Sequence, residues 1–298
     1  MDNVLLLGNG FSRMLFKDMP AWKELFSSMH SQVKNYTILY EICWLNSAGV
    51  SEADKKKELA KKIKESVSAE KINWELKSLR EFGEKLKKKH IYNIITTNYD
   101  NGIDILLCDI CGYKAAKKTS ADEKVYSIRT YTEYENKKLG HKVKIWKIHG
   151  EFNRIASIMF GYDQYCGALS KLSQYIKGSY KSSSKNGPMC KTSIMDKCRY
   201  NEFDGVSWAE LFFNSNVYIA GLGMDFSEID LWWLLNKRAR IKKELSKISN
   251  KICYLYNKKY DDREEKKDIF KALEAFDVGT FEIDWDEDFI NNIFDKIL

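Results

Sequence analysis

The chain has 298 residues, of which 44% are hydrophobic and 31% charged, with 16 glycines and 2 prolines. This composition is typical of a globular protein and excludes intrinsic disorder and collagen-like or proline-rich fibres. The formal net charge of +7 is compatible with a nucleic-acid-binding surface. However, the lysine runs alternate with glutamates at helical spacing, which is typical of a solvated helix face, so we do not expect nucleic acid as a partner.

No apolar run approaches the roughly 18 residues of a membrane span, and the first residues lack the features of a signal peptide. We therefore expect a cytoplasmic protein without a membrane partner. The seven cysteines are expected to be free thiols. Cys108 and Cys111 have the spacing of two zinc ligands, but a second such pair is missing. We expect both on one face of the helix after Asn101, and no metal.

Short apolar runs alternate with amphipathic stretches along the chain. Runs without a polar interruption predict strands covered on both faces, as in a parallel sheet; they span residues 4–7, 92–95, 145–148, 217–220 and 252–256, with an edge strand at 280–283. Helical spacing is found at residues 22–29, 55–67, 74–88, 226–245 and 261–276. The alternation predicts an α/β fold with a Rossmann-like, doubly wound and mostly parallel sheet.

Two regions interrupt this alternation. Residues 31–84 are rich in Lys and Glu and have no strand pattern, and residues 161–204 contain the low-complexity stretch 182–188. We interpret the first as a helical insertion and the second as a loop and helix insertion, both within a single domain that spans residues 1–298.

The first predicted strand leads into the loop Gly8–Ser12, and the glycines of this loop allow backbone N–H groups to approach a pyrophosphate. A Gly-x-Gly sequence also fits an ordinary tight turn. Arg13 stands where the dinucleotide fingerprint has its third glycine, which disfavours a dehydrogenase. A P-loop sequence is missing as well, which disfavours a P-loop NTPase.

The other predicted strands also end in small or polar residues. The second leads into Thr96–Asp100, which can hold a ribose or cap the following helix. The third leads into His149, which is either a packed residue or a general base. The fourth leads into a second glycine loop, Gly221–Asp225, and the last into Asn257. The carboxyl ends of parallel strands meet at one sheet edge, so these residues together predict one ligand site.

The chain resembles the SIR2 (sirtuin-like) superfamily in six segments that occur in the order found in that family. They are LLLGNGFS (5–12), MPAWKELF (19–26), ITTNYD (95–100), KIHGE (147–151), YIAGLGMDFSEID (218–230) and YLYN (254–257). Within it they resemble the bacterial SIR2-like NADases of antiphage defence. The first loop alone also resembles the AbiH phage-exclusion family. The resemblance implies that NAD+ is the substrate and that Asn98 and His149 are the catalytic pair. It further implies that NAD+ is held by Gly8, Asn9, Gly10, Phe11, Ser12, Thr97, Asp100, Gly221, Gly223, Asp225 and Asn257.

The chain departs from deacylase sirtuins after His149, where their four-cysteine zinc module is missing. It also has Ala21 and Trp22 after Pro20, where deacylases have Asp-Phe-Arg. The resemblance therefore implies cleavage of NAD+ to nicotinamide and ADP-ribose rather than deacylation. In this mechanism Asn98 orients the ribose or the attacking water, and a neutral His149 accepts a proton.

Such an enzyme depletes NAD+ in abortive infection and has to be inactive until it is triggered. We expect that the chain forms a homo-oligomer or has a separately encoded sensor or regulatory subunit as its partner. This partner could be a nucleotide-handling protein. The alternative is that the chain is itself a non-catalytic NAD- or nucleotide-binding regulatory subunit. That alternative needs the glycine loops but not Asn98 and His149 together.

Overall fold

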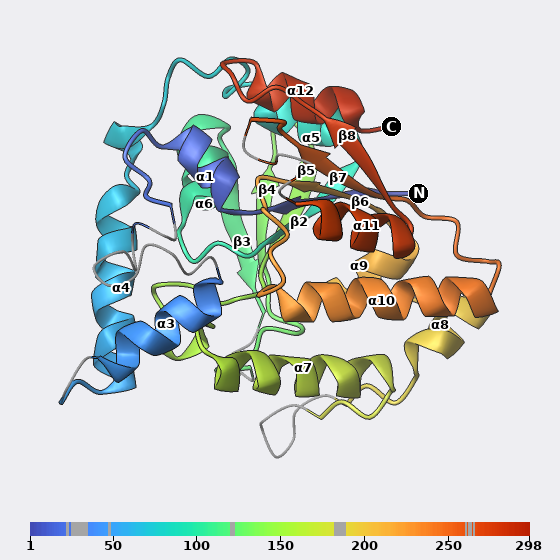
Figure 1. Ribbon diagram of the computed structural model, residues 1–298. Coiled ribbons are helices and arrows are strands. Elements are labelled where there is room, and N and C mark those ends of the chain that lie inside the picture. The colour runs from blue at the N-terminus through green and yellow to red at the C-terminus, as the bar shows by residue number, and fades with distance from the viewer. Residues whose placement is uncertain are drawn as a thin grey trace.

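The computed structural model describes residues 1–21, 24, 35–46, 49–119, 123–181, 189–259, 261, 264 and 266–298. In these residues one eight-stranded sheet is covered by helices on both faces (Figure 1). The strands are β1 (Asn3–Leu7), β2 (Ile91–Thr96), β3 (Lys114–Lys118), β4 (Thr132–Asn136), β5 (His141–Lys147), β6 (Asn216–Ala220), β7 (Ile252–Tyr256) and β8 (Val278–Glu282).

The helices differ widely in length. The longer ones are α3 (Tyr36–Leu45), α4 (Glu52–Ser66), α7 (Tyr162–Ile176), α10 (Ile229–Glu244), α11 (Lys267–Ala275) and α12 (Phe289–Lys296). The shorter α-helices are α1 (Asn9–Leu15), α5 (Phe82–Lys88), α6 (Gly102–Ile105), α8 (Ile194–Tyr200) and α9 (Trp208–Asn214). Three further turns are η1 (Ala69–Lys71) and η3 (Ile155–Ser157), which are 3₁₀-helical, and η2 (Leu106–Ile110), which is π-helical.

The strand order is β3-β4-β5-β2-β1-β6-β7-β8. Strands β5, β2, β1, β6, β7 and β8 pair in parallel, whereas β3 and β4 form an antiparallel extension at one edge. The chain builds outward from β1 to β2 and β5, and then returns to place β6 on the other side of β1. In sheets of this kind ligands bind at the carboxyl ends of the strands where the order reverses, which here are β1 and β6.

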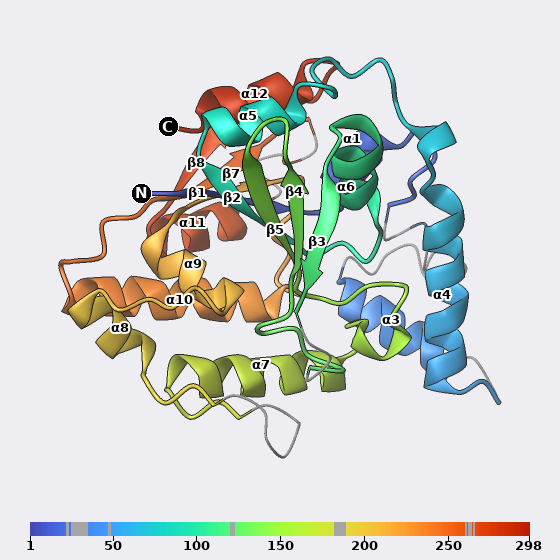
Figure 2. The same cartoon turned by 180° about the vertical axis from the view of Figure 1, so that it is seen from behind.

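Two hydrophobic cores, one on each face of the sheet, follow from the alternation of side chains along the buried strands. In β1 Leu5 and Leu7 belong to one core, which also contains residues of α1, α4, α5 and α12. Val4 and Leu6 belong to the other, with residues of α7, α9, α10 and α11. The view from behind shows these two groups of helices on opposite sides of the strands (Figure 2). The predicted doubly wound α/β fold is confirmed.

Each predicted strand is present, with bounds that differ by a few residues. Strands β3 and β4 were not predicted, because their sequences KAAKK and TEYEN are mostly polar. An edge hairpin needs few buried apolar side chains, so it gives a weak hydrophobic pattern. The predicted helix over 74–88 is wrong for residues 74–81, which form turns. Ser78 there has φ +62°, which is incompatible with a right-handed helix.

The two interpreted insertions contain helices in the described residues. Helices α3 and α4 lie within 31–84, and α7 and α8 lie within 161–204. The predicted helix at 22–29 falls almost entirely outside the described residues, as does the stretch 182–188. The division into one domain with two insertions stays a prediction. Among the described residues, none of the helices has the length and apolarity needed to cross a membrane.

Candidate active site

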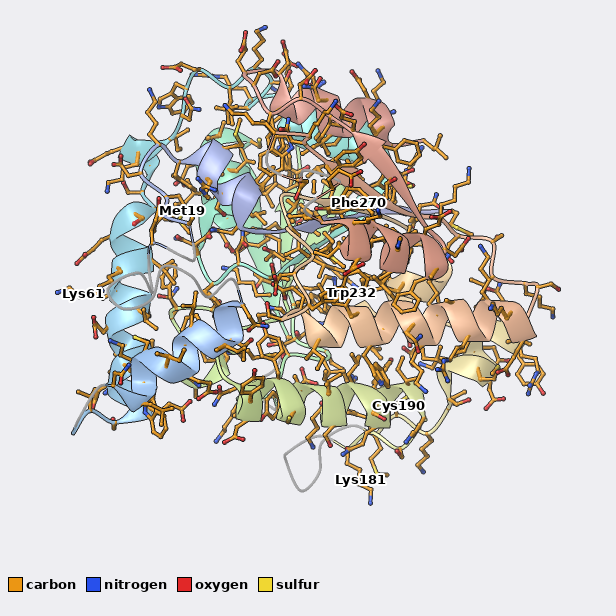
Figure 3. The ribbon with its side chains drawn as sticks, in the orientation of Figure 1. Met19, Lys61, Lys181, Cys190, Trp232 and Phe270 are labelled. Atoms are coloured by element: carbon orange, nitrogen blue, oxygen red, sulfur yellow. The ribbon has the colours of Figure 1, made fainter. Side chains whose placement is uncertain are left out.

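A cavity of about 390 Å³ lies at the carboxyl ends of β1 and β6, where the strand order reverses. Its walls come from both glycine loops, from the chain after α1 and from the C-terminal part; they include Asn9, Gly10, Arg13, Lys17, Met19, Gly221, Gly223, Asp225, Glu228, Asp261, Lys266 and Trp285. Figure 3 shows Met19 beside α1. The predicted ligand edge therefore has a cavity.

The structure differs from the predicted first loop, because its residues from Asn9 onward form the first turn of α1, with Gly8 directly before it. We keep the name first glycine loop for this segment, which packs backbone to backbone against the second glycine loop. The Gly10 N–H donates to the Gly221 carbonyl over 2.7 Å. A Cβ on Gly8 would lie 2.6 Å from that same oxygen, and a Cβ on Gly221 would lie 2.4 Å from the Phe11 nitrogen. Gly221 also has φ +68°, which favours glycine. Gly8 and Gly221 are therefore required by the contact between the loops, whether or not a ligand is bound.

Gly223 has a different environment. A Cβ added there would meet only the Lys266 Nζ, at 3.6 Å, and both residues line the cavity. Among the predicted binding residues, Asn9, Gly10, Gly221, Gly223 and Asp225 line the cavity. The structure therefore brings the two loops together around one space, as the sequence predicted.

Asn98 lies behind the first loop in a buried hydrogen-bond chain. Its Nδ2 donates to the Gly8 carbonyl (3.0 Å) and to the Ser12 Oγ (2.8 Å), and Ser12 in turn donates to Asp100 Oδ2 (2.9 Å). Asp100 Oδ1 accepts from the N–H of Gly102, the first residue of α6, over 2.7 Å. Burial raises the pKa of Asp100. Asn98 Oδ1 is buried without a hydrogen-bond partner among the described residues.

His149 lies between two carboxylates. Its Nε2 is 3.0 Å from Asp230 Oδ2, and its Nδ1 is 3.6 Å from Glu228 Oε2. Burial lowers the pKa of His149, but the attraction of both carboxylates outweighs it and raises the pKa to about 9. At neutral pH the ring is therefore an imidazolium, not the neutral imidazole expected from the sequence. We call these three residues the Asp230–His149–Glu228 triad.

Glu228 joins this triad to the cavity. It lines the cavity, whereas Asn98 and His149 do not, and each of those two is only 2% exposed. Burial raises the pKa of Glu228 to about 7, with the His149 cation opposing the shift. No hydrogen bond links Asn98 to His149, both of which belong to the described part of the chain. The predicted catalytic pair is therefore divided between two networks.

The remaining predicted residues lie around the cavity rather than in its walls. Phe11 is buried in the core, where its ring contacts Phe82 and Phe289 at 6.1 and 6.0 Å between centroids. Thr97 is buried at the end of β2. Asn257 Nδ2 donates to the Ile283 carbonyl over 3.0 Å. These positions fit supporting roles more closely than direct contact with a ligand.

Several cavity residues were not predicted. Arg13, Lys17 and Lys266 contribute positive charge, and Lys266 pairs with Asp261. Trp285 lies so close to Gly10 that a Cβ there would be 2.4 Å from its ring. Among the cavity residues that were not predicted, only Glu228 had a detectable signal, as an acidic residue shortly after the second glycine loop.

Aromatic packing fixes the helix that begins at Ile229. Trp232 lies on α10 beside α11 (Figure 3), with its ring centroid 6.0 Å from that of Phe276. Its Nε1 donates to the Asp225 carbonyl over 3.1 Å. These contacts hold the loop that carries Asp225 and Glu228 against α10.

The triad is also the group of acidic and imidazole side chains, among the described residues, that could hold a metal ion. One ligand atom from each of its three residues lies within 4.8 Å of the others. Each imidazole nitrogen already faces a carboxylate, so we interpret the set as an ion triad. The seven cysteines are free thiols, as predicted. Cys108 lies in η2 and Cys111 directly follows it, and both pack against the core.

Comparison with known proteins gives one family. The sequence profile of the SIR2-like domain matches residues 92–274, which is more than half of the chain. The matched region includes Asn98, His149, the second glycine loop and Glu228. No curated protein matches the chain significantly.

Proposed function

Because the chain belongs to the SIR2-like domain family, which is associated with the use of NAD+, we propose that it hydrolyses NAD+ to nicotinamide and ADP-ribose. The observation that supports this proposal is the cavity at the carboxyl ends of β1 and β6, which is lined by both glycine loops and by charged side chains of both signs. Deacylation lacks comparable support, since the four cysteines that follow His149 do not have the paired spacing of the deacylase zinc module.

The charges of the cavity suit this substrate. NAD+ carries a diphosphate, and Arg13, Lys17 and Lys266 supply cations for it. Side chains have to supply much of the binding to the diphosphate, because the Gly10 N–H already donates to the Gly221 carbonyl. The reacting end of NAD+ is cationic, and its C1′ carbon gains positive character as the glycosidic bond breaks. Asp225 and Glu228 in the same cavity would stabilise that charge.

Hydrolysis of the glycosidic bond needs few further groups from the protein. Nicotinamide leaves as a neutral amine, so no acid has to protonate it. The protein must hold the ribose in one orientation, exclude bulk water and accept a proton from the water that attacks C1′. Asn98 fixes the first loop through Gly8 and Ser12, and its unpartnered Oδ1 is available to a ribose hydroxyl or to that water after a small rearrangement.

A second candidate is a non-catalytic NAD-binding regulatory subunit. It is favoured by the burial of Asn98 and His149, each of which lies outside the cavity walls and is held by other protein groups. In such a protein the two networks would serve only to fix the glycine loops and α10.

The test compares wild-type protein with Asn98→Ala, and uses Asn292→Ala on α12 as the matched control. Nicotinamide and ADP-ribose are followed by chromatography in lysates of phage-infected and uninfected cells, and NAD+ binding is measured with the purified proteins. We expect products with wild type and Asn292→Ala, and a loss of about 10²-fold or more with Asn98→Ala. Intact NAD+ in every lysate, with NAD+ bound by the purified chain, would instead establish the regulatory subunit.

The biological role is part of the same proposal. We propose that NAD+ depletion is toxic to the infected cell, so that the chain acts in antiphage defence and is held inactive until a trigger, an oligomerisation step or a partner subunit releases it. Products that form only in infected lysates would support a trigger. Full activity of the purified chain without any addition would contradict it.

A further inference from the structure

We propose that Glu228, and not His149, accepts the proton from the water that attacks C1′ of NAD+. This inference rests on the proposed function and adds a catalytic residue to it. Glu228 is the member of the triad that lines the cavity, whereas His149 and Asp230 are buried behind it.

The position of Glu228 suits a proton acceptor. Its side chain is 15% exposed, and its Oε2 is buried without a hydrogen-bond partner among the described residues. A carboxylate that is mostly buried at a cavity wall has lost much of its hydration and gains by binding a water O–H from the cavity. Its Oε2 faces His149 Nδ1 at 3.6 Å, so the imidazolium supports the charge of the carboxylate from the protein side, while the side chain lines the cavity where a water could bind.

The other carboxylates of the cavity are already engaged. Asp225 Oδ1 accepts from the Ser227 N–H over 2.8 Å, which uses it in the turn before α10. Asp261 pairs with Lys266. Glu228 is therefore the acidic side chain of the cavity, in the described part of the chain, that accepts no hydrogen bond from a protein group and pairs with no lysine.

The groups around Glu228 bring its pKa into a range that suits a general base. Charged and titratable groups reach it from several elements: His149 after β5, Asp230 on α10, Asp225 in the preceding loop, and Tyr99 and Tyr165 from the segments after β2 and on α7. Burial is the largest influence on its pKa and raises it to about 7, with His149 limiting the rise. A general base with a pKa near the working pH combines availability with basicity.

The step is balanced without another reactant. The water oxygen forms a bond to C1′ while the C1′–N bond breaks, and the electron pair of that bond stays on the nicotinamide nitrogen. One water proton moves to the Glu228 carboxylate and is later released to solvent. His149 and Asp230 act as positioning residues, because the imidazolium, held by Asp230 at 3.0 Å, keeps Glu228 in place.

The experiment uses Glu228→Gln, which keeps the shape of the side chain and removes its basicity, with the exposed Glu244→Gln at the end of α10 as the matched control. We measure kcat, KM and NAD+ affinity from pH 5 to 9. Glu228→Gln should lose about 10²- to 10⁴-fold in kcat, keep NAD+ affinity within a few fold, and lose the rise in rate through about pH 7. Glu244→Gln should match wild type.

A second variant keeps the test independent of folding. Glu228→Ala removes the carboxylate and leaves space, so added formate should restore part of the lost rate in that variant and have no effect on wild type. Wild-type activity retained by Glu228→Gln and lost in His149→Gln would overturn the proposal and return the role of base to His149. Absence of nicotinamide release from wild type in infected lysate would overturn the proposed function itself.

Discussion

Replacing Asp230 by asparagine removes the carboxylate that lies 3.0 Å from His149 Nε2. The two carboxylates raise the pKa of this buried imidazole from its usual 6.5 to about 9. A shift of about 2.5 units corresponds to roughly 3 kcal/mol of stability. Because the pKa is raised in the folded state, this stability is complete below about pH 6.5 and is lost as the pH rises through about 9.

The measurement is guanidinium unfolding of wild type and Asp230→Asn at pH 6.5 and pH 10, with the exposed Asp268→Asn on α11 as the control. At pH 6.5 the variant should be less stable by about 3 kcal/mol, because the buried imidazolium has lost its nearest carboxylate. At pH 10 wild type has lost the same contribution, so the difference should narrow to about 1 kcal/mol or less. Asp268→Asn should follow wild type at both values.

Two results would show that this reasoning is wrong. The first is a difference in the free energy of unfolding between wild type and Asp230→Asn that is as large at pH 10 as at pH 6.5. The second is an Asp230→Asn protein as stable as wild type at pH 6.5. Either result would mean that His149 is neutral in the folded protein, and its role as the charged partner of Glu228 would have to be abandoned.

Two further predictions concern the glycine loops and the cysteines. Gly221→Ala should lose about 1–3 kcal/mol of stability and melt at a markedly lower temperature, because its Cβ would lie 2.4 Å from the Phe11 nitrogen. Gly223→Ala should melt like wild type. Equal melting temperatures for the two variants would contradict the loop packing. Prolonged treatment with a zinc chelator should leave the melting temperature unchanged, since Cys108 and Cys111 pack against the core; a fall in the melting temperature would contradict the assignment of both as core residues.

Much of the fold could be predicted from the sequence because the central strands are buried on both faces. In a strand such as Asn3–Leu7, where all five residues are buried, the four residues after Asn3 form an unbroken apolar run. The edge strands Lys114–Lys118 and Thr132–Asn136 could not be found in this way, because their exposed faces are polar. Ser78 shows a further limit, since a left-handed residue can interrupt a sequence with helical spacing.

The candidate site was predicted in part. Short-range sequence patterns identified both glycine loops, and the rule for the carboxyl ends of parallel strands placed them together. The patterns could not show that Gly10 donates to Gly221, or that Trp285 covers Gly10. Both facts depend on contacts between residues far apart in the chain.

The role expected for His149 illustrates the same limit. A histidine after a strand predicts a base near neutral pH, but its charge depends on which groups face it. Asp230 and Glu228 follow it by about 80 residues in the sequence, and only the fold brings them to its two ring nitrogens. The cavity-lining Glu228 is consequently a catalytic candidate that spacing alone did not reveal.

The cavity can be tested as the NAD+ site by adding a side chain where the structure has room for one. Gly223→Leu extends from the cavity wall at a position where the nearest atom to a Cβ is the Lys266 Nζ, at 3.6 Å, so the fold should be retained. NAD+ binding by the purified variant and release of nicotinamide in infected lysate should both be lost, while the melting temperature stays that of wild type. A folded Gly223→Leu protein that binds and cleaves NAD+ as wild type does would show that this cavity is not the site.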